Sequence, residues 1–287
     1  ISASLVGSEM CIRDRINSHG IYGYYGDYKE YNNSIKWWMK NRHNWEIDTS
    51  WIFTTHGLVN GTGLCIDAFT KPGDGIILFT PVYYQFSNLV EAARRKVVEC
   101  PLKLLDNQYQ FDFVAYERNL SGDEKMVILC SPHNPGGRVW TKNELQEVAK
   151  FAKKHNLVLV SDEIHHDLVY PNKNHTVMPI ADPSVCDRLV MMTATTKTFN
   201  IAGAHSGNVI ISNPNLRQKF SQRIKALGIS PNSFGLFMAT AAYSPEGAEW
   251  LDELLHYIDG NRVIFDKEVN KIPGPVSYTH LRAHETS

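Results

Sequence analysis

Short apolar runs of strand length, separated by longer amphipathic segments, constrain the fold of this chain more than any other feature of its sequence. The predicted strands are residues 75–79 (GIILF), 126–130 (MVILC), 157–161 (LVLVS), 188–193 and 208–212. Between the second and third of them, apolar residues recur at helical spacing. This alternation predicts an α/β protein with a mostly parallel sheet.

Two helices can be placed with their boundaries. The first spans residues 141–155, where Thr141 is the expected N-cap and Glu144, three residues later, completes a capping box. The second is expected over residues 244–256, in a C-terminal part whose pattern is helical from residue 216 onward.

The composition favours a small-molecule function. The 287 residues carry a net charge of −1, so the electrostatics give no reason to expect nucleic acid or a membrane as partner. The five cysteines include no Cys-x-x-Cys pair, which argues against a disulfide framework or zinc finger and favours a reducing, cytoplasmic setting. The apolar runs are far shorter than the roughly 20 residues of a membrane helix, and the N-terminus does not resemble a signal peptide.

Polar clusters follow the predicted strands, at the positions where open α/β sheets bind ligands. They are residues 60–63 (NGTG), Tyr83 with Tyr84, residues 133–137 (HNPGG), residues 162–167 (DEIHHD), and Lys197.

Each cluster, taken alone, has a plain alternative interpretation. The turn at 60–63 either offers amides to a phosphate at a helix N-terminus or simply leads into a helix. Lys197 is either a Schiff-base lysine or a solvated surface lysine, and Asp162 either caps a helix or pairs with a heterocyclic nitrogen. The carboxylates and imidazoles of 162–167 match no metal-binding spacing, so we expect no metal site.

Taken together, the clusters resemble one enzyme family. Three segments resemble, in this order along the chain, the large domain of fold-type I pyridoxal-phosphate enzymes, the class I/II aminotransferase superfamily. They are SPHNPGGRVW, SDEIHHDLVY and TKTFNIAG. Its cystathionine β-lyase or C–S lyase branch, of the MalY/PatB type, is similar in HGIYGYY, NRHNWEI and PGDGIILFTPVYYQF. The resemblance covers about residues 16–273 and implies a three-layer α/β/α sandwich.

The resemblance implies pyridoxal 5′-phosphate as the cofactor and assigns residues to its ring. Lys197 would hold the cofactor covalently, and Asp162 would keep the pyridine nitrogen protonated. Asn134 and His165 would hydrogen-bond the phenolic oxygen of the ring. Tyr83 would stack on the ring face.

The resemblance also assigns residues to the phosphate group. Gly61 and Thr62 would supply amides, and Thr195 would add a hydroxyl. Tyr24 would reach the phosphate of a neighbouring subunit, which implies a homodimer with shared active sites. His205 departs from the family, because many aminotransferases carry a phosphate-binding arginine there.

Both ends of the chain depart from the family pattern. Residues 1–15 and 275–287 resemble translated adapter sequence, and we interpret them as foreign segments. Residues 16–258 are expected to form the cofactor-binding large domain, and 259–274 the start of a truncated small domain. The chain is therefore expected to be a fragment of a longer bacterial enzyme that lacks the family's N-terminal segment and carboxylate-binding arginine, and to be inactive by itself.

The predicted function is that of a C–S lyase that acts on an amino acid substrate, a cysteine thioether such as cystathionine. An aminotransferase would use the same residues, so the sequence leaves this alternative open. A regulatory homologue without catalysis is disfavoured, because Lys197, Asp162, Asn134 and Tyr83 are all present.

Overall fold

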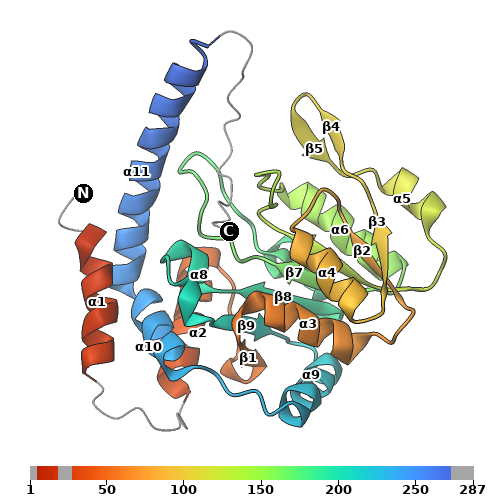
Figure 1. Ribbon diagram of the computed structural model, residues 1–287, viewed down its shortest axis with the longest axis horizontal. Coiled ribbons are helices and arrows are strands. Elements are labelled where there is room, and N and C mark those ends of the chain that lie inside the picture. Colours follow the sequence, from red (N-terminus) through yellow and green to blue (C-terminus); the bar gives the residue numbers. More distant parts are fainter. Residues whose placement is uncertain (1–4, 19–27, 273–287) are drawn as a thin grey trace.

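The computed structural model describes residues 5–18 and 28–272, and a seven-stranded sheet forms its centre (Figure 1). From one edge to the other the strands are β1 (Ile52–Thr55), β9 (Gly207–Ile210), β8 (Leu189–Thr193), β7 (Val158–Asp162), β6 (Glu124–Cys130), β2 (Gly75–Leu78) and β3 (Lys96–Glu99). The strands from β3 to β8 run parallel, whereas β9 is antiparallel to β8, and β1 to β9. The predicted α/β class and mostly parallel sheet are confirmed, and the strands of this sheet that were not predicted are its two edge strands, β1 and β3.

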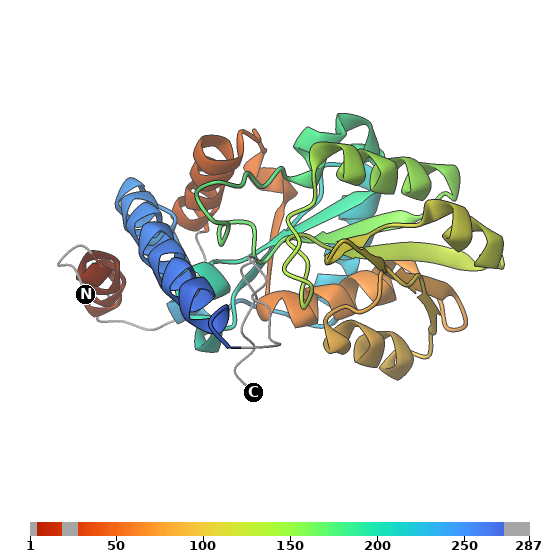
Figure 2. The same cartoon turned by 90° about the horizontal axis from the view of Figure 1, so that it is seen from above.

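Helices cover both faces of the sheet, as Figure 2 shows from above. One layer holds α5 (Phe113–Asn119), α6 (Lys142–Lys154) and α7 (Met178–Ala181), and the other holds α3 (Gly57–Phe69), α4 (Tyr84–Ala92) and α9 (Pro214–Ala226). Alternate residues of β6 serve the two layers: Val127 and Leu129 pack under the first, and Met126 and Ile128 under the second. The three-layer α/β/α architecture is therefore confirmed.

Helix α6 begins where its capping box predicts. The Thr141 hydroxyl accepts a hydrogen bond from the Glu144 amide, and the Glu144 carboxylate accepts one from the Thr141 amide. Leu145 and Val148 are fully buried on the face that meets the sheet. A strong local start signal and an apolar stripe at helical spacing thus agree, which is why this prediction is confirmed within one residue at each end.

A third group of helices packs beside the sheet around Trp38 and Tyr243, whose rings stack. It comprises α1 (Leu5–Asn17), α2 (Lys29–His43), α10 (Ser233–Ala242) and α11 (Pro245–Val269). Helix α1 packs on α10 and α11 and buries Ile12, although residues 1–15 were interpreted as foreign. Helix α11 extends well beyond residue 256, so the domain boundary expected at residue 258 falls inside a continuous helix.

The remaining elements are short. They are the hairpin β4 (Lys103–Leu105) and β5 (Gln108–Gln110), the one-turn helix α8 (Thr195–Thr198), and the 3₁₀ turns η1 (Thr49–Trp51), η2 (Pro183–Asp187) and η3 (Ala202–Ala204).

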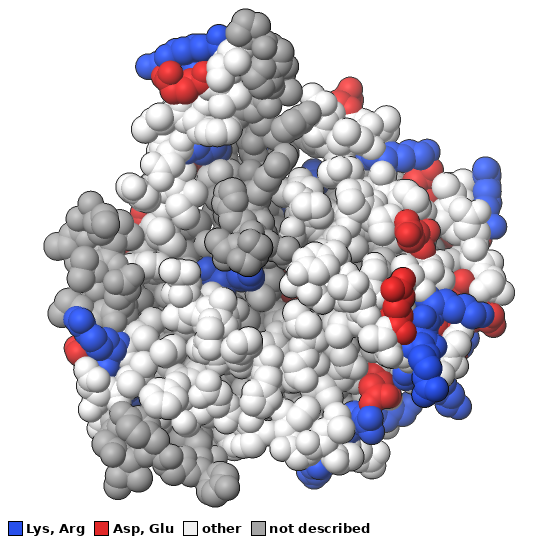
Figure 3. All heavy atoms as spheres, in the orientation of Figure 1, with Lys and Arg blue, Asp and Glu red and all other residues white. Residues whose placement is uncertain are grey.

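The surface combines charged and apolar regions. On the face in Figure 3, charged side chains of both signs gather toward the β3 and α4 edge, while much of the remaining described surface is uncharged. Outward-facing residues of α11 include Tyr257, Val263, Ile264 and Phe265, each more than half exposed. Within the described ranges, no helix combines the length and apolar character needed to span a membrane.

Candidate functional site

The carboxyl ends of β6, β7 and β8 lie side by side and carry residues that the sequence singled out. Cys130 at the end of β6 is in register with Asp162 at the end of β7, and Asp162 is in register with Met192 on β8. Asn134 follows β6 in a turn, and Lys197 follows β8 within α8. The parallel strand order therefore brings three predicted site residues, Asn134, Asp162 and Lys197, to the carboxyl ends of neighbouring strands.

Asp162 is a buried carboxyl group, 6% exposed. Its Oδ1 accepts a hydrogen bond of 3.1 Å from the Ile164 amide. Burial raises the pKa of Asp162 to about 7, although this hydrogen bond and the positive charge of Lys197 act to lower it. The group therefore needs a cationic partner to be fully ionised at neutral pH.

Lys197 lies on a short helix whose other side chains are buried. Thr195, Thr196 and Thr198 surround it in the sequence, and Lys197 itself is partly exposed. The Thr195 hydroxyl oxygen is buried and has no hydrogen-bond partner among the described residues. A buried hydroxyl without a partner is costly, so this atom is suited to donate to a bound ligand.

His165 is buried next to these groups. Burial lowers the pKa of His165 to about 4, and the positive charge of Lys197 contributes to that shift. The imidazole is therefore neutral at physiological pH, when it can donate one hydrogen bond and accept another.

The expectation that Gly61 and Thr62 stand at a helix N-terminus is wrong. Helix α3 already begins at Gly57, so both residues lie inside the helix, where their amides belong to the regular backbone ladder. The Thr62 hydroxyl is also used, because it donates to the Leu58 carbonyl at 2.9 Å. The amides without a partner within this helix are those of its first turn, Gly57, Leu58 and Val59.

Gly207, at the start of β9, lets the chain pass close to this first turn. A Cβ atom there would lie 2.9 Å from the Gly57 carbonyl carbon and 3.1 Å from the Leu58 amide nitrogen. We expect Gly207→Ala to lower the free energy of unfolding by about 1–3 kcal/mol through overpacking. Gly203→Ala, where no atom lies within 4 Å of the new Cβ, is the matched control and should change it by less than about 0.5 kcal/mol. Equal effects in urea denaturation would contradict this steric account.

The other predicted residues lie in different settings. Tyr83 is half-buried at the start of α4, with its ring edge-on to those of Tyr84 and Phe86. Asn134 is 8% exposed, and its backbone amide donates a hydrogen bond to the sulfur of Cys130. His205 is exposed in a left-handed backbone conformation. Tyr24 lies outside the described residues.

A buried polar cluster centred on Asp167 was not predicted. The Trp38 indole and the Thr198 hydroxyl each donate to its carboxylate at 3.0 Å, and His43 Nε2 lies 2.9 Å from it. Thr198 is adjacent to Lys197, so the cluster supports the lysine-bearing helix. The only signal in the sequence was the run 162–167, because Trp38 and His43 come from α2.

The sheet order, with a lysine, a buried carboxyl group and an amide side chain after neighbouring parallel strands, is that of the α/β class whose members bind ligands at their strand ends. The chain belongs to the aminotransferase class I and II family, which matches residues 12–285. The match includes residues 12–15 and 275–285, which were expected to be foreign.

Proteins similar to this chain include one that is named as a cystathionine beta-lyase. Cystathionine beta-lyase PatB of Bacillus subtilis is 36% identical over 252 residues, which are 87% of this chain and 65% of PatB. Protein MalY of Escherichia coli is 30% identical, over 91% of this chain and 67% of MalY. The crystal structure of cystalysin from Treponema denticola, which contains pyridoxal 5′-phosphate, has a TM-score of 0.87 and 38% identity, and the alignment covers 96% of this chain and 68% of cystalysin. The chain thus spans about two thirds of the length of these relatives.

Proposed function

We propose that this chain is the cofactor-binding part of a pyridoxal-phosphate-dependent C–S β-lyase, which releases a thiol, pyruvate and ammonia from a cysteine thioether such as cystathionine. The observation that carries the proposal is the buried Asp162 carboxyl group, which lies near enough to Lys197 for their charges to interact. The proposal is also supported by the name of PatB, a cystathionine beta-lyase, and by the pyridoxal 5′-phosphate bound in cystalysin. Residues 16–258 would form the large domain and 259–274 the start of a small one.

The residues of the site fit this cofactor. A carboxyl group that is buried without full compensation suits a protonated ring nitrogen, which is why Asp162 would take that position. A phosphate dianion would suit the unpartnered Thr195 hydroxyl and the backbone amides of the first turn of α3, which are those of Gly57, Leu58 and Val59. These amides take the place of the Gly61 and Thr62 amides that the sequence predicted. Asn134, His165 and Tyr83 keep the ring contacts that the family resemblance assigns.

Pyridoxal phosphate, when bound, supplies an electron sink for the electron pair left on the substrate Cα. Lys197 Nζ would hold the cofactor before the substrate arrives, and its free amine would remove the Cα proton as general base. Asp162 would hold a proton on the ring nitrogen through its negative charge. In the balanced reaction, a cysteine thioether and one water molecule give a thiol, pyruvate and ammonia.

Product assays with two substrate mixtures test this function, and they use a version of this chain extended to the length of its relatives. Cystathionine alone should yield pyruvate, ammonia and a thiol in equal amounts. An aminotransferase would move the proton from Cα to the cofactor's C4′ carbon, again through Lys197, and would require a keto acid. Amino-group exchange that depends on a keto acid, without pyruvate release from cystathionine, would replace the lyase by that alternative.

The homodimer with shared sites is also a proposal, resting on the resemblance of Tyr24 to the residue that reaches a neighbouring subunit's phosphate. Sedimentation equilibrium tests it. A single species at the monomer mass of 32.6 kDa across micromolar concentrations would contradict it.

The buried Asp162 predicts a pH dependence of stability for the protein without cofactor. Its pKa is raised from 3.8 to about 7, so the folded state binds a proton that the unfolded state releases between these values. The contribution of Asp162 to the free energy of unfolding should therefore fall as the pH rises from about 4 to about 7, by about 1.4 kcal/mol per pH unit at most. Buried histidines such as His165, whose pKa is lowered, contribute with the opposite sign, so the measurement is the difference between the unmutated protein and Asp162→Asn. That difference should change with pH over this range, whereas the difference from the exposed Asp187→Asn should not. A difference from Asp162→Asn that does not change with pH would contradict the assignment.

A further inference from the structure

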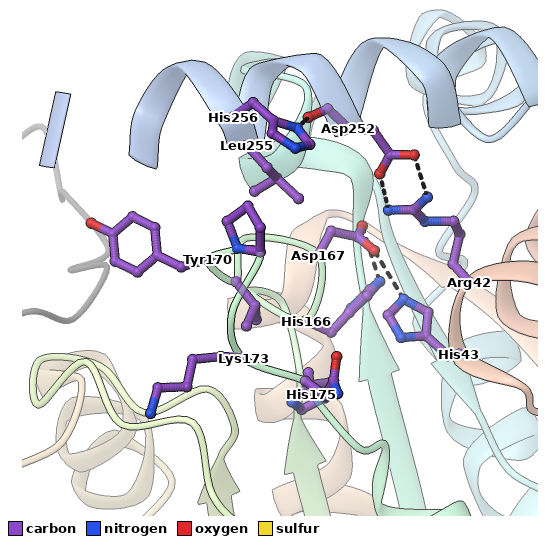
Figure 4. Close-up of a pocket in the computed structure, with 13 residues that line it drawn as sticks. Arg42, His43, His166, Asp167, Tyr170, Lys173, His175, Asp252, Leu255 and His256 are labelled. Atoms are coloured by element: carbon purple, nitrogen blue, oxygen red, sulfur yellow. Dashed lines mark hydrogen bonds and ion pairs between the residues drawn. The ribbon is translucent and has the colours of Figure 1, made fainter. Parts of the chain in front are cut away.

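We propose that His43, His166 and Asp167 bind one divalent first-row transition metal ion such as Zn²⁺. His43 ends helix α2, and the other two residues follow β7, so the site joins segments 124 residues apart in the chain. Figure 4 shows both imidazoles directed at the Asp167 carboxylate, that of His43 from α2 and that of His166 from the loop after β7. This proposal is independent of the lyase reaction.

The geometry around His166 leaves its Nε2 atom open to either a second ring proton or a metal ion. Its Nδ1 lies 2.5 Å from the Glu163 carbonyl oxygen, which can only accept, so Nδ1 carries the hydrogen. In the neutral ring, Nε2 then holds a lone pair, yet it lies 3.1 Å from Oδ2 of Asp167. Nε2 is buried, and within the described structure it interacts favourably with that carboxylate only when the ring carries a second proton. A metal ion between the two acceptors would bind both lone pairs.

The donor atoms have the chemistry and spacing of a transition-metal site. Two imidazole nitrogens and one carboxylate oxygen form a common zinc ligand set, with bonds of about 2.0–2.2 Å. Tetrahedral ligands at that radius lie about 3.3 Å apart. His43 Nε2 is 2.9 Å from Asp167 Oδ1, and one donor atom from each of the three residues lies within 4.8 Å of the others. Small side-chain shifts would therefore admit the ion.

Surrounding groups hold these ligands in place. Trp38 and Thr198 donate to the Asp167 carboxylate, and the Glu163 carbonyl fixes the tautomer of His166. Such outer contacts orient ligands in natural metal sites. The ligands border a cavity of about 300 Å³, which gives room for a water molecule as fourth ligand. With three protein ligands, the ion would fasten the end of α2 to the loop after β7.

Metal binding to the chelator-treated protein tests the proposal. After dialysis against Zn²⁺ or Co²⁺, plasma mass spectrometry should find one ion per chain. His43→Gln and Asp167→Asn should weaken binding at least about 100-fold. His155→Gln is the matched control, because His155 also lies beside a carboxylate, that of Glu117 at 3.4 Å, but far from any third ligand in the described structure. Far-UV circular dichroism checks that each variant folds.

Three outcomes would overturn the proposal. The first is that the unmutated protein binds far less than one metal ion per chain, which would leave an imidazolium–carboxylate pair at this position. The second is a His43→Gln variant that binds as tightly as the unmutated protein. The third uses no variant: X-ray absorption of the Zn²⁺ form should show nitrogen and oxygen neighbours, and a sulfur-dominated shell would assign the ion to cysteines instead.

Discussion

In a version of this chain extended to the length of its relatives, turnover is expected to fall by at least about a thousandfold when Lys197 is replaced by alanine, because two functions disappear together. The Nζ atom is the proposed point of covalent attachment for pyridoxal phosphate, and the same amine is the proposed base for the substrate Cα proton. A neighbouring group would not replace it easily, because α8 is short and its other side chains are buried threonines.

Spectroscopy separates this result from simple misfolding. The unmutated protein should show the absorbance band of lysine-bound cofactor, and borohydride should convert it into a stable adduct that mass spectrometry locates on Lys197. The band and the adduct should both be missing in Lys197→Ala. Lys150→Ala, on the exposed side of α6, is the control and should keep both. A reducible band in Lys197→Ala would show that another residue holds the cofactor.

Asp162→Ala is expected to keep part of its cofactor but to lose most of its activity. Removing one member of a buried charge pair costs about 3–5 kcal/mol, which corresponds to about 150-fold to 4,000-fold in rate if it acts on the transition state. The physical reason is that the ring nitrogen would no longer be held protonated, so the substrate Cα would lose its electron sink.

The stability prediction makes this experiment decisive. Burial raises the pKa of Asp162, so a neutral residue at this position removes a cost of folding at neutral pH rather than adding one. Asp162→Asn should therefore remain folded while turnover falls, and the surface variant Asp187→Asn should retain normal turnover. Near-normal turnover in a folded Asp162→Asn protein would contradict the proposed role.

Part of the site could be predicted because its signals are local. Asp162, Asn134 and Lys197 each follow an apolar run that is recognisable in a few residues, and parallel strands place such segments at one edge of a sheet. The same is true of the α6 capping box, in which Thr141 and Glu144 lie within one turn. Their assignment to cofactor chemistry comes from the family resemblance and remains a prediction.

The glycines of 60–63 show where local rules fail. Glycine disfavours a helix interior, so the run was interpreted as a turn before the helix. In the structure, Gly61 lies inside α3 against the sheet, where a Cβ atom would approach the Thr55 hydroxyl and a Val209 methyl group to 3.2 Å. Close helix–sheet packing outweighs the intrinsic preference, and only the tertiary structure shows this.

The sequence by itself determined the fold class, the core strands and the polar residues that follow them, because hydrophobic periodicity and capping act over a few residues. Only the tertiary structure decided where α3 begins, how far α11 extends, and that His43 meets Asp167. The last contact depends on how α2 packs beside the sheet. No pattern of neighbouring residues encodes such packing, because it reflects the burial of Trp38 and its surroundings among segments far apart in the chain.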